Sequence, residues 1–528
     1  LRYAAWRMRN RIVSGGTKWL WRLRDSRALR LSVLFRRAER KGKRFARSRP
    51  IRPVRPIENS PPPGISLIIP SRNGKTLLNT CLSAPGLASA DEVIVVDNGS
   101  TDGSAEFLKS TLPKAVVICT TESLSFSAAI NLGLKHVSYS HVCLLNNDME
   151  VEDGFLRHLR ESFHHTPDLF CSSAQIFLPA GQRREETGKT ILTWKHNYDE
   201  FPIRCVEPLE GEDESFVLYG SGGCSLYDTA KLRSLGGMDE VYQPAYVEDL
   251  DLGVRAWLRG WPSVLASRAR TLHHHRSTTS KYFSTRELDV ALHTNFARFL
   301  IRAVPDPHWF RTLWHEASLR WKVAKDEDLL RTLAAMKREP VAQGDMGFLA
   351  LTNGDVAVFP GRPRSGKPVI LIASPYVPFP LAHGAAVRIF NLIRETSKDF
   401  DIALVCFTEQ PSPIARELLD LCVEVVTVHR HGSHTHKSQG RPDTVEEFDS
   451  PSFHGALRWS VAKWQPQVVQ LEFTQMAIYS RDCHPARTVL VEHDITFDLF
   501  EQLVAQHDDR SEERRVGKEC RSRWSPYH

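Results

Sequence analysis

The stretch Cys143–Val151, "CLLNNDMEV", decides how the first folded part of this chain is interpreted. An apolar run from His141 to Leu145 predicts a buried strand, and it ends in Asn146, Asn147 and Asp148. In an open α/β sheet, ligands bind just beyond the carboxyl ends of parallel strands. A carboxylate at such a position can hold a hard divalent cation and, through it, a diphosphate. The alternative is a polar turn in which Asp148 only caps the next helix.

The sequence on both sides of this stretch alternates short apolar runs with helical patterns, which predicts a parallel α/β sheet. The predicted strands before it are Ile65–Ser71, Glu92–Asp97 and 115–119, with helices over 75–87 and 126–136. Asp97 and Asp148 both end strands, so we expect them at one edge of the sheet. One carboxylate could accept a hydrogen bond from a base or ribose, and the other could bind a metal ion.

Five segments, in the same order along the chain, resemble glycosyltransferase family 2 and its rhamnosyltransferase-like branch. They are "SLIIPSRNG", "DEVIVVDNGSTDGS", "LLNNDMEV", "GSGGCSLYDTAKLRSLGGMDE" and "YVEDLDLGVRAWLRGW". The resemblance covers residues 64–305 and implies a GT-A fold. It also implies transfer of a sugar, with inversion, from a nucleoside-diphosphate-sugar to a glycan or lipid-linked acceptor in bacterial-type polysaccharide synthesis, with Mg²⁺ or Mn²⁺ as cofactor.

The same resemblance implies roles for individual residues. Asp148 stands at the position of the family's metal motif, where it alone of "NND" is anionic. A histidine near the metal is implied at His273 or His275, and the run of three histidines leaves the choice among His273, His274 and His275 open. The alternative is a partly buried polar run. The residues implied around the nucleotide are Pro70, Ser71, Asn73, Asp97, Asn147 and Gly222.

A second acidic group, Glu248 and Asp249, begins the predicted helix "EDLDLGVRAWLRG". Carboxylates in a first helical turn often only complement the helix dipole, which favours their ionised form. In the family, the equivalent Asp is the general base that removes the acceptor's hydroxyl proton, a step that the chemistry requires. We predict Asp249 as the base and Glu248 as the second choice.

Two further regions follow the first predicted domain. Residues 306–366 read as a helical connector and linker, and residues 367–509 resemble the N-terminal half of a family 4-type GT-B glycosyltransferase. That resemblance rests on Pro378, Pro380, Gly384 and Arg388, and a plain Rossmann-like binding module would give the same pattern. Such a half domain is expected to be inactive by itself. The expected fold class is therefore α/β, a GT-A nucleotide-sugar-binding domain plus a truncated Rossmann-like domain.

Two short patterns in these regions could suggest ligand sites. Gly361–Pro368, "GRPRSGKP", fits the spacing of a phosphate-binding loop, but a strand follows it where a helix is required. A tract of histidines could bind metal, although a solvated loop is the expectation. Its members are His429, His431, His434 and His436.

The charge of the chain is concentrated at its ends. Residues 1–56 hold 19 Lys and Arg against Asp25 and Glu39, whereas residues 57–509 carry a net charge of −13. Residues 1–63 therefore predict a basic helical arm and a Pro-rich linker. Its Trp and Leu residues could pack on a neighbouring domain or enter a membrane surface, and nucleic acid is the least favoured partner.

Other features concern the origin and location of the chain. It starts at Leu1, and residues 510–528 look like a translated sequencing adapter, so we expect a fragment with a non-native tail. The ten cysteines form no CxxC pair, which is typical of a reducing cytosol. With no predicted membrane span or signal peptide, the expected location is cytoplasmic, with peripheral contact to the inner face of the membrane.

Two other functions fit parts of the pattern. A non-catalytic nucleotide- or glycan-binding module on the same fold would be free to lose Asp148 and Asp249, and this chain has both. A nucleotidyltransferase would also bind a nucleotide at the carboxyl ends of parallel strands. Such an enzyme should carry a Gly-rich loop with Lys after the first strand, where this chain has "SRNGK".

Overall fold

The computed structural model describes residues 61–179, 184–185, 187–192, 201–274, 281–337, 344, 347–431 and 443–493. The chain divides into two compact units, Leu1–Arg52 and Pro53–His528, and all described residues belong to the second. The predicted basic arm, the tail over 510–528, His275, His434 and His436 lie outside the described residues. None of the helices in the described ranges combines the length and apolar character that spanning a bilayer requires.

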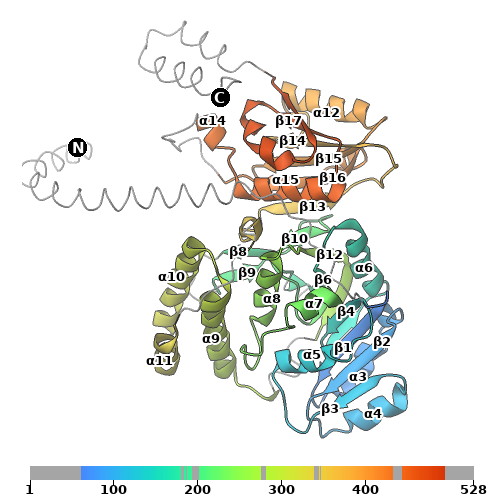
Figure 1. The fold of residues 1–528 in the computed structure, drawn as a ribbon, viewed down its shortest axis with the longest axis vertical. Helices are drawn as coiled ribbons and strands as arrows, with labels where there is room; N and C mark the ends of the chain where they lie inside the picture. The colour runs from blue at the N-terminus through green and yellow to red at the C-terminus, as the bar shows by residue number, and fades with distance from the viewer. Residues whose placement is uncertain are drawn as a thin grey trace, which may run out of the picture. The chain divides into compact units, whose positions relative to one another are not determined.

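The first sheet is mixed and begins with the parallel strands that the sequence predicts (Figure 1). These are β1 (Ile65–Ser71), β2 (Glu92–Asp97), β3 (Val116–Cys119) and β4 (His141–Leu145). The sheet continues through β11 (Cys224–Asp228), β6 (Cys171–Phe177), β12 (Ser263–His273) and β10 (Ser215–Val217), in the order β10-β12-β6-β11-β4-β1-β2-β3. β5 (Met149–Val151) pairs with β12, and β7 (Arg184–Glu185) with β6. A separate pair is β8 (Thr190–Leu192) with β9 (Ile203–Cys205).

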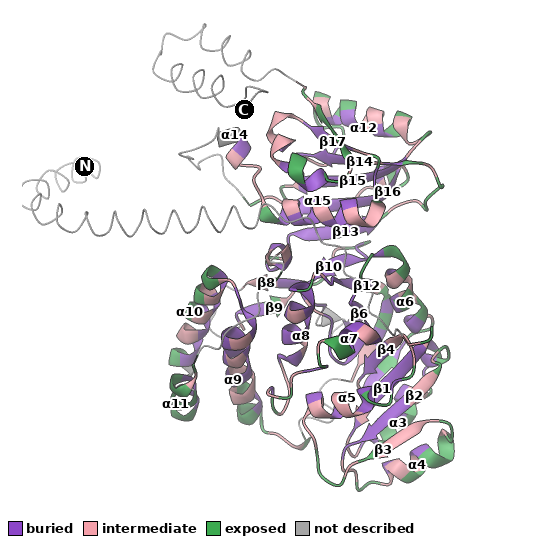
Figure 2. Cartoon of the chain, viewed as in Figure 1, coloured by how far each residue is buried: buried purple, intermediate pink, exposed green. Residues whose placement is uncertain are grey.

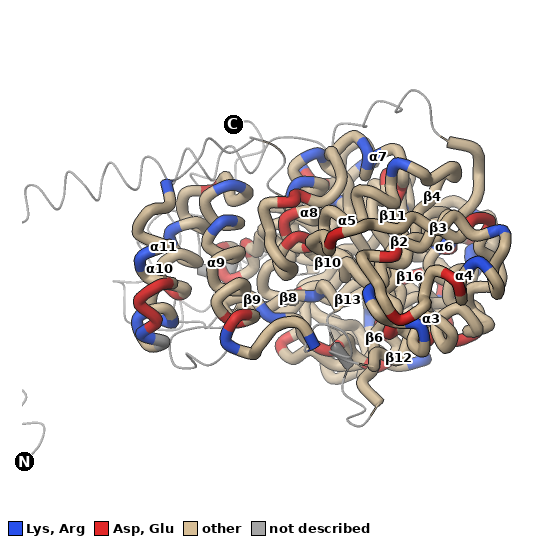
Figure 3. The backbone as a smooth tube through the Cα atoms, turned by 90° about the horizontal axis from the view of Figure 1, so that it is seen from below, with Lys and Arg blue, Asp and Glu red and all other residues tan. Residues whose placement is uncertain are grey.

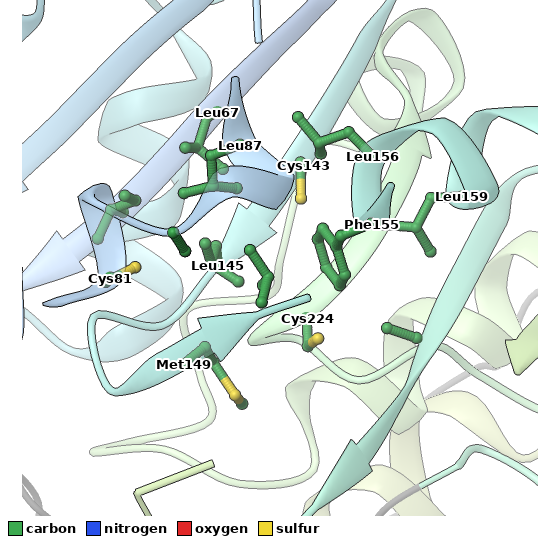
Figure 4. Close-up of a cluster of buried hydrophobic side chains, with 14 of the residues drawn as sticks. Leu67, Cys81, Leu87, Cys143, Leu145, Met149, Phe155, Leu156, Leu159 and Cys224 are labelled. Atoms are coloured by element: carbon green, nitrogen blue, oxygen red, sulfur yellow. The ribbon is translucent and has the colours of Figure 1, made fainter. Parts of the chain in front are cut away.

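Alternation along β1 explains why helices cover both faces of this sheet, because successive side chains of a strand point to opposite faces. Leu67 packs in one cluster with α3 (Lys75–Leu82) and α6 (Phe155–His165), as Figure 4 shows for Leu67, Phe155 and Leu156. Ile68 packs in the opposite cluster with α5 (Phe126–Leu134) and α8 (Glu248–Trp257). Burial of each such Leu, Ile or Phe side chain stabilises the fold by about 1.5–3 kcal/mol. Packing on both faces therefore fixes the position of the sheet. The buried strands stand out in Figure 2.

Some local predictions needed correction. The helix predicted over 75–87 ends at Leu82, and a short 3₁₀ turn, η1 (Pro85–Leu87), follows because Pro85 cannot continue an α-helix. The other helices of this part are α4 (Ser104–Thr111), α7 (Thr229–Ser234), α9 (Thr285–Ala303), α10 (Pro307–Ala324) and α11 (Glu327–Ala335), followed by the 3₁₀ turn η3 (Gly347–Leu351).

The second sheet has six strands in the order β13-β16-β15-β14-β17-β18, and only β13 runs antiparallel to its neighbour. Its strands are β13 (Val356–Pro360), β14 (Val369–Ser374), β15 (Asp401–Thr408), β16 (Cys422–His429), β17 (Val468–Glu472) and β18 (Arg487–Val491). The accompanying helices are α12 (Gly384–Thr396), α13 (Arg416–Leu419), α14 (Asp443–Glu446), α15 (Pro451–Trp464) and the 3₁₀ segment η4 (Thr474–Cys483).

β13 was not predicted, since its residues fall within the expected connector and linker; β6, β10 and β11 of the first sheet were not predicted either. The loop Gly361–Pro368 therefore follows a strand after all, but it leads into β14 and not into a helix. Its Arg362 and Ser365 side chains bind Asp401, at 2.8 Å each. These internal contacts agree with its rejection as a phosphate-binding loop.

The two sheets meet through β10 and β13. Val358 N donates to Ser215 Oγ at 2.8 Å, and Asp213 N donates to Val358 O at 3.0 Å. Beside this contact the buried Lys463 Nζ lies 3.0 Å from Glu214 Oε2 and 2.5 Å from Glu424 Oε2. Removal of one partner from such a buried group of charges is strongly destabilising.

Candidate active site

The candidate site lies at one edge of the first sheet, along β2, β1, β4 and β11. Asp97 ends β2 directly opposite Ser71, the last residue of β1. Asn147 follows β4, and its Nδ2 donates to Ser71 Oγ at 2.8 Å. β11 is antiparallel to β4, so its start reaches the same edge, where Asn146 N donates to Gly223 O at 2.9 Å. The strand order thus brings four predicted binding segments together.

Asp97 is deeply buried, with 3 % of its surface exposed. Its Oδ1 atom is buried and meets no hydrogen-bond donor among the described residues. A buried carboxylate oxygen without a donor is costly, so this atom suits a ligand that brings its own N–H or O–H group.

Ser71 and Asn147 are held in close contact by the loop after β1. A Cβ atom on Gly74 would lie 2.3 Å from Asn147 Nδ2 and 2.6 Å from Ser71 Oγ. A side chain at position 74 would therefore displace these two side chains from their present contact. Pro70, the other predicted binding residue of β1, is half-buried and lies opposite Val96.

The side chain of Asn73 ties loops together. Its Oδ1 accepts from Thr101 N at 2.7 Å, and its Nδ2 donates to Tyr282 OH at 2.8 Å. Its own backbone N–H donates to Ser100 Oγ at 2.8 Å. Asn73 thus positions the loop after β1 against the loop after β2, and its contact with a nucleotide stays a prediction.

Tyr282 was missed at the sequence level. Besides accepting from Asn73, its ring lies under the guanidinium of Arg72, with Arg72 Cζ 4.0 Å from the ring centroid. The two residues are about two hundred positions apart in the sequence, and no motif marks the tyrosine. Only the fold reveals that it closes over the loop after β1.

Asp148 and His273 form the candidate metal position. Asp148 is buried, and its Oδ1 has no hydrogen-bond donor within the described part of the chain. His273 Nε2 lies 3.4 Å from that oxygen, because the end of β12 pairs with β5, which directly follows Asp148. An unsatisfied carboxylate oxygen beside an imidazole fits a divalent cation.

The structure distinguishes His273 from His274 by the carboxylate that each ring contacts. His274 turns its ring away, with Nε2 3.2 Å from Glu150 Oε2, while its backbone N–H donates to Asp148 O at 2.9 Å. His275 lies outside the described residues. Of the two described, His273 is the one whose ring meets Asp148.

The acidic first turn of α8, visible in Figure 3, follows two strained residues. Tyr246 and Val247 both have a φ of 79°, a conformation that is an outlier for bulky and β-branched side chains. Asn295 of α9 secures this turn, since its Nδ2 lies 2.9 Å from Ala245 O and 3.2 Å from Tyr246 O. Strain of this kind persists only where the surroundings enforce it.

Asp249 connects this turn to the sheet edge. Its Oδ1 accepts from Leu250 N at 2.8 Å, and its Oδ2 accepts a longer bond from Gly222 N at 3.4 Å. A Cβ on Gly222 would lie 3.5 Å from Asp249 Cβ, in ordinary contact. Burial raises the pKa of Asp249 above its ordinary value, and the two backbone donors offset this only in part.

The neighbouring carboxylates differ in their surroundings. Asp251 is buried, and its carboxylate binds Arg255 Nε at 2.6 Å and Tyr242 OH at 3.1 Å. Such a paired group is structural. Glu248 is buried as well. The contact with Gly222 therefore favours Asp249 as the group that faces the sheet edge.

Parts of the chain are similar to known proteins. Residues 66–233 match the sequence model of "Glycosyl transferase family 2". Over 212 residues the chain is 26 % identical to the N-acetylglucosaminyl-diphospho-decaprenol L-rhamnosyltransferase of Mycobacterium tuberculosis, a match that covers 36 % of this chain and 68 % of that enzyme. It is also 26 % identical over 221 residues to an O-antigen biosynthesis protein of Myxococcus xanthus, covering 40 % of this chain and 17 % of that protein.

Among solved structures, the chain is similar to S. aureus TarS 1–349 in complex with UDP-GlcNAc. The TM-score is 0.36 at 15 % identity, over 55 % of this chain and 81 % of that one.

Proposed function

We propose that residues 64–305 form a GT-A-type inverting glycosyltransferase that transfers one sugar from a nucleoside-diphosphate-sugar to a glycan or lipid-linked acceptor. The observation that carries the proposal is the row of groups along one sheet edge: Asp97, Ser71 with Asn147, and Gly222 with Asp249. These groups lie in or directly beside the region that matches glycosyltransferase family 2. The domain boundaries and the family 4-type GT-B assignment of residues 367–509 stay predictions.

The donor would lie across this edge. Asp97 Oδ1, buried and without a donor among the described residues, would accept from the base or the ribose. Asp148 and His273 would hold Mg²⁺ or Mn²⁺, and the bound ion would supply positive charge that neutralises the diphosphate.

Asp249 would act on the acceptor. Its carboxylate takes the proton from an acceptor hydroxyl while that oxygen attacks the anomeric carbon of the donor sugar. The bond from the acceptor oxygen to the anomeric carbon forms, the bond to the diphosphate oxygen breaks, and the nucleoside diphosphate leaves on the opposite face. A single displacement of this kind inverts the anomeric configuration. The raised pKa of Asp249 suits a base, since a catalytic pKa nearer the working pH is more effective.

The acceptor class is inferred from the named relatives. One acts, by its name, on N-acetylglucosaminyl-diphospho-decaprenol, and another belongs to O-antigen biosynthesis. We extend this to a diphosphate-linked lipid sugar as acceptor, with the enzyme at the cytoplasmic face of a membrane. Residues 1–56, which lie outside the described residues, would add the basic contact with anionic lipid.

A donor screen tests the proposal. The full chain is incubated with a panel of nucleotide sugars, including a nucleotide-activated L-rhamnose, with Mg²⁺ or Mn²⁺ and N-acetylglucosaminyl-diphospho-polyprenol. Release of nucleoside diphosphate should depend on one donor, and NMR should show an inverted anomeric configuration in the product. Donor binding by calorimetry without turnover across the panel would instead identify a binding module and overturn the proposal.

A further inference from the structure

A second group of metal-binding side chains lies in the other sheet, where β13 begins and β16 ends. Asp355 precedes β13, and His429 is the last residue of β16. The strands are antiparallel, and His429 N donates to Asp355 O at 2.8 Å. His431 is two residues further on, so continued strand alternation favours the same side as His429. Only the unpredicted strand β13 brings the carboxylate to this corner.

The three side chains converge. One ligand atom from each of Asp355, His429 and His431 lies within 4.8 Å of the other two. His431 Nε2 is 2.5 Å from Asp355 Oδ1, and the two imidazole centroids are 4.2 Å apart. A tetrahedral Zn²⁺ with bonds of about 2.0–2.1 Å holds its ligand atoms roughly 3.4 Å apart. Small side-chain rotations therefore suffice to bring these atoms to binding distance.

The surroundings orient two of the three groups. Ser452 Oγ lies 3.0 Å from Asp355 Oδ2, which leaves Oδ1 toward the histidines. His429 Nε2 lies 3.1 Å from Glu409 O. A carbonyl oxygen can only accept, so Nε2 carries the proton and neutral His429 keeps the lone pair of Nδ1 for a cation. Metal-binding histidines commonly donate their second ring nitrogen to a backbone carbonyl in this way.

Charge and access also suit a cation. The side chain of Asp355 is 4 % exposed and that of His431 is 59 % exposed, so an ion could enter from solvent and reach a buried carboxylate. Arg430, which lies between the histidines in sequence, pairs with Glu409 and Glu447.

We propose that Asp355, His429 and His431 form a binding site for one divalent transition-metal ion, with Zn²⁺ as the best match to two imidazoles and a carboxylate. Three protein ligands leave a fourth position for water. Bound there, the ion would fasten the start of β13 to the end of β16. The site differs in chemistry from the position at Asp148 and His273, because it offers two imidazoles where that position offers one, and nitrogen ligands favour Zn²⁺, Ni²⁺ or Co²⁺ over Mg²⁺. This proposal stands apart from the proposed transferase activity.

Metal titration of the untagged full chain tests the site. After treatment with a chelator, the protein is titrated with Zn²⁺ by calorimetry, with Mg²⁺ in parallel, and Co²⁺ binding is followed by visible absorption. One tight Zn²⁺ site per chain is expected. His431→Asn should weaken this binding by at least about 100-fold, which exceeds a typical outer-shell loss. His308→Asn, an exposed histidine of α10, should leave it unchanged.

Two more variants separate the possible sources of binding. Asp148→Asn should retain the tight Zn²⁺ site, since that residue belongs to the first sheet. His434→Ala combined with His436→Ala should also retain it. If the His434/His436 variant abolishes binding while His431→Asn does not, or if the unaltered chain binds Zn²⁺ no better than His431→Asn, the proposed site is refuted. Because the His431 side chain is largely exposed, its replacement should leave the circular dichroism spectrum unchanged.

Discussion

Replacement of Asp249 by Asn removes the proposed proton acceptor and keeps the size of the side chain. The amide oxygen can keep the 2.8 Å bond from Leu250 N. The amide nitrogen would then face Gly222 N, which now donates a 3.4 Å bond to the carboxylate. Loss of so long a bond should cost at most about 1 kcal/mol. Asn also removes a buried charge, so we expect the melting temperature to stay level or rise.

The expected kinetic effect is much larger. A positioned general base contributes about 10²–10⁴-fold in rate, which corresponds to about 2.7–5.4 kcal/mol of activation free energy. The loss should appear in kcat, with donor affinity nearly unchanged, because Asp97, Asp148 and the Ser71–Asn147 pair are intact.

The assay is release of nucleoside diphosphate at saturating donor and acceptor, measured as a function of pH. Asp249 must be unprotonated to accept a proton, and burial raises its pKa. Turnover should therefore fall as the pH drops through a value above the ordinary 3.8 of an aspartate. Asp249→Asn should lack this acidic limb.

Two variants from the same helical turn serve as controls. Asp251→Asn removes the buried ion pair with Arg255 and keeps only one of the two oxygens that accept from Arg255 and Tyr242, so it should lower stability more than kcat at permissive temperature. Glu248→Gln should cost less turnover than Asp249→Asn. A reversed order would make Glu248 the base, and a wild-type kcat in both Asp249→Asn and Glu248→Gln would refute the mechanism.

Three further predictions concern the metal position and the stability of the fold. Asp148→Asn should abolish metal-dependent donor binding in calorimetry, whereas full transferase activity in EDTA would contradict the metal assignment. Lys463→Met removes the cation between two buried glutamates and should lower the free energy of unfolding by about 3–5 kcal/mol; an unchanged urea midpoint would contradict the contact. Burial alone would lower the pKa of His454, but hydrogen bonds with Asp449 and Asp482 raise it overall. The contribution of protonated His454 to the free energy of unfolding should therefore be complete below the unfolded-state pKa of about 6.5 and be lost as the pH rises through its folded-state pKa. If the melting temperatures of the unaltered chain and of His454→Gln vary identically with pH from about pH 5 to 9, this contribution is excluded.

The sequence predicted the four parallel strands of the first sheet because their signals are local, whereas β6, β10 and β11 were not predicted. Apolar runs such as Ile65–Ser71 end in polar residues, and the rule that ligands meet the carboxyl ends of parallel strands then places Asp97 and Asp148 on one edge. The structure has the strands at the predicted residues. The positions of Asp97 and Asp148 follow from the order and direction of their strands. They could therefore be predicted without knowledge of side-chain packing.

Other parts depend on partners that are distant in sequence. β13 is five residues long and ends in Pro360, so it reads as linker until its pairing with β16 is known. That pairing alone brings Asp355 to the histidines, and the tract therefore looked like a solvated loop. Likewise, Tyr282 closes on Asn73 without any motif, because a single hydrogen bond between distant loops leaves no periodic trace in a sequence.

The strained turn before α8 shows why the role of Asp249 cannot follow from the helix dipole alone. A bulky residue held at positive φ costs of order 1–3 kcal/mol, and here Tyr246 and Val247 are consecutive. Asn295 stabilises that geometry from a different helix through its bonds to this turn. With the backbone so fixed, α8 begins where Asp249 reaches Gly222 and Asp251 points to Arg255. Two carboxylates of one helical turn thus receive different surroundings, one a buried ion pair and the other a contact with the proposed donor edge.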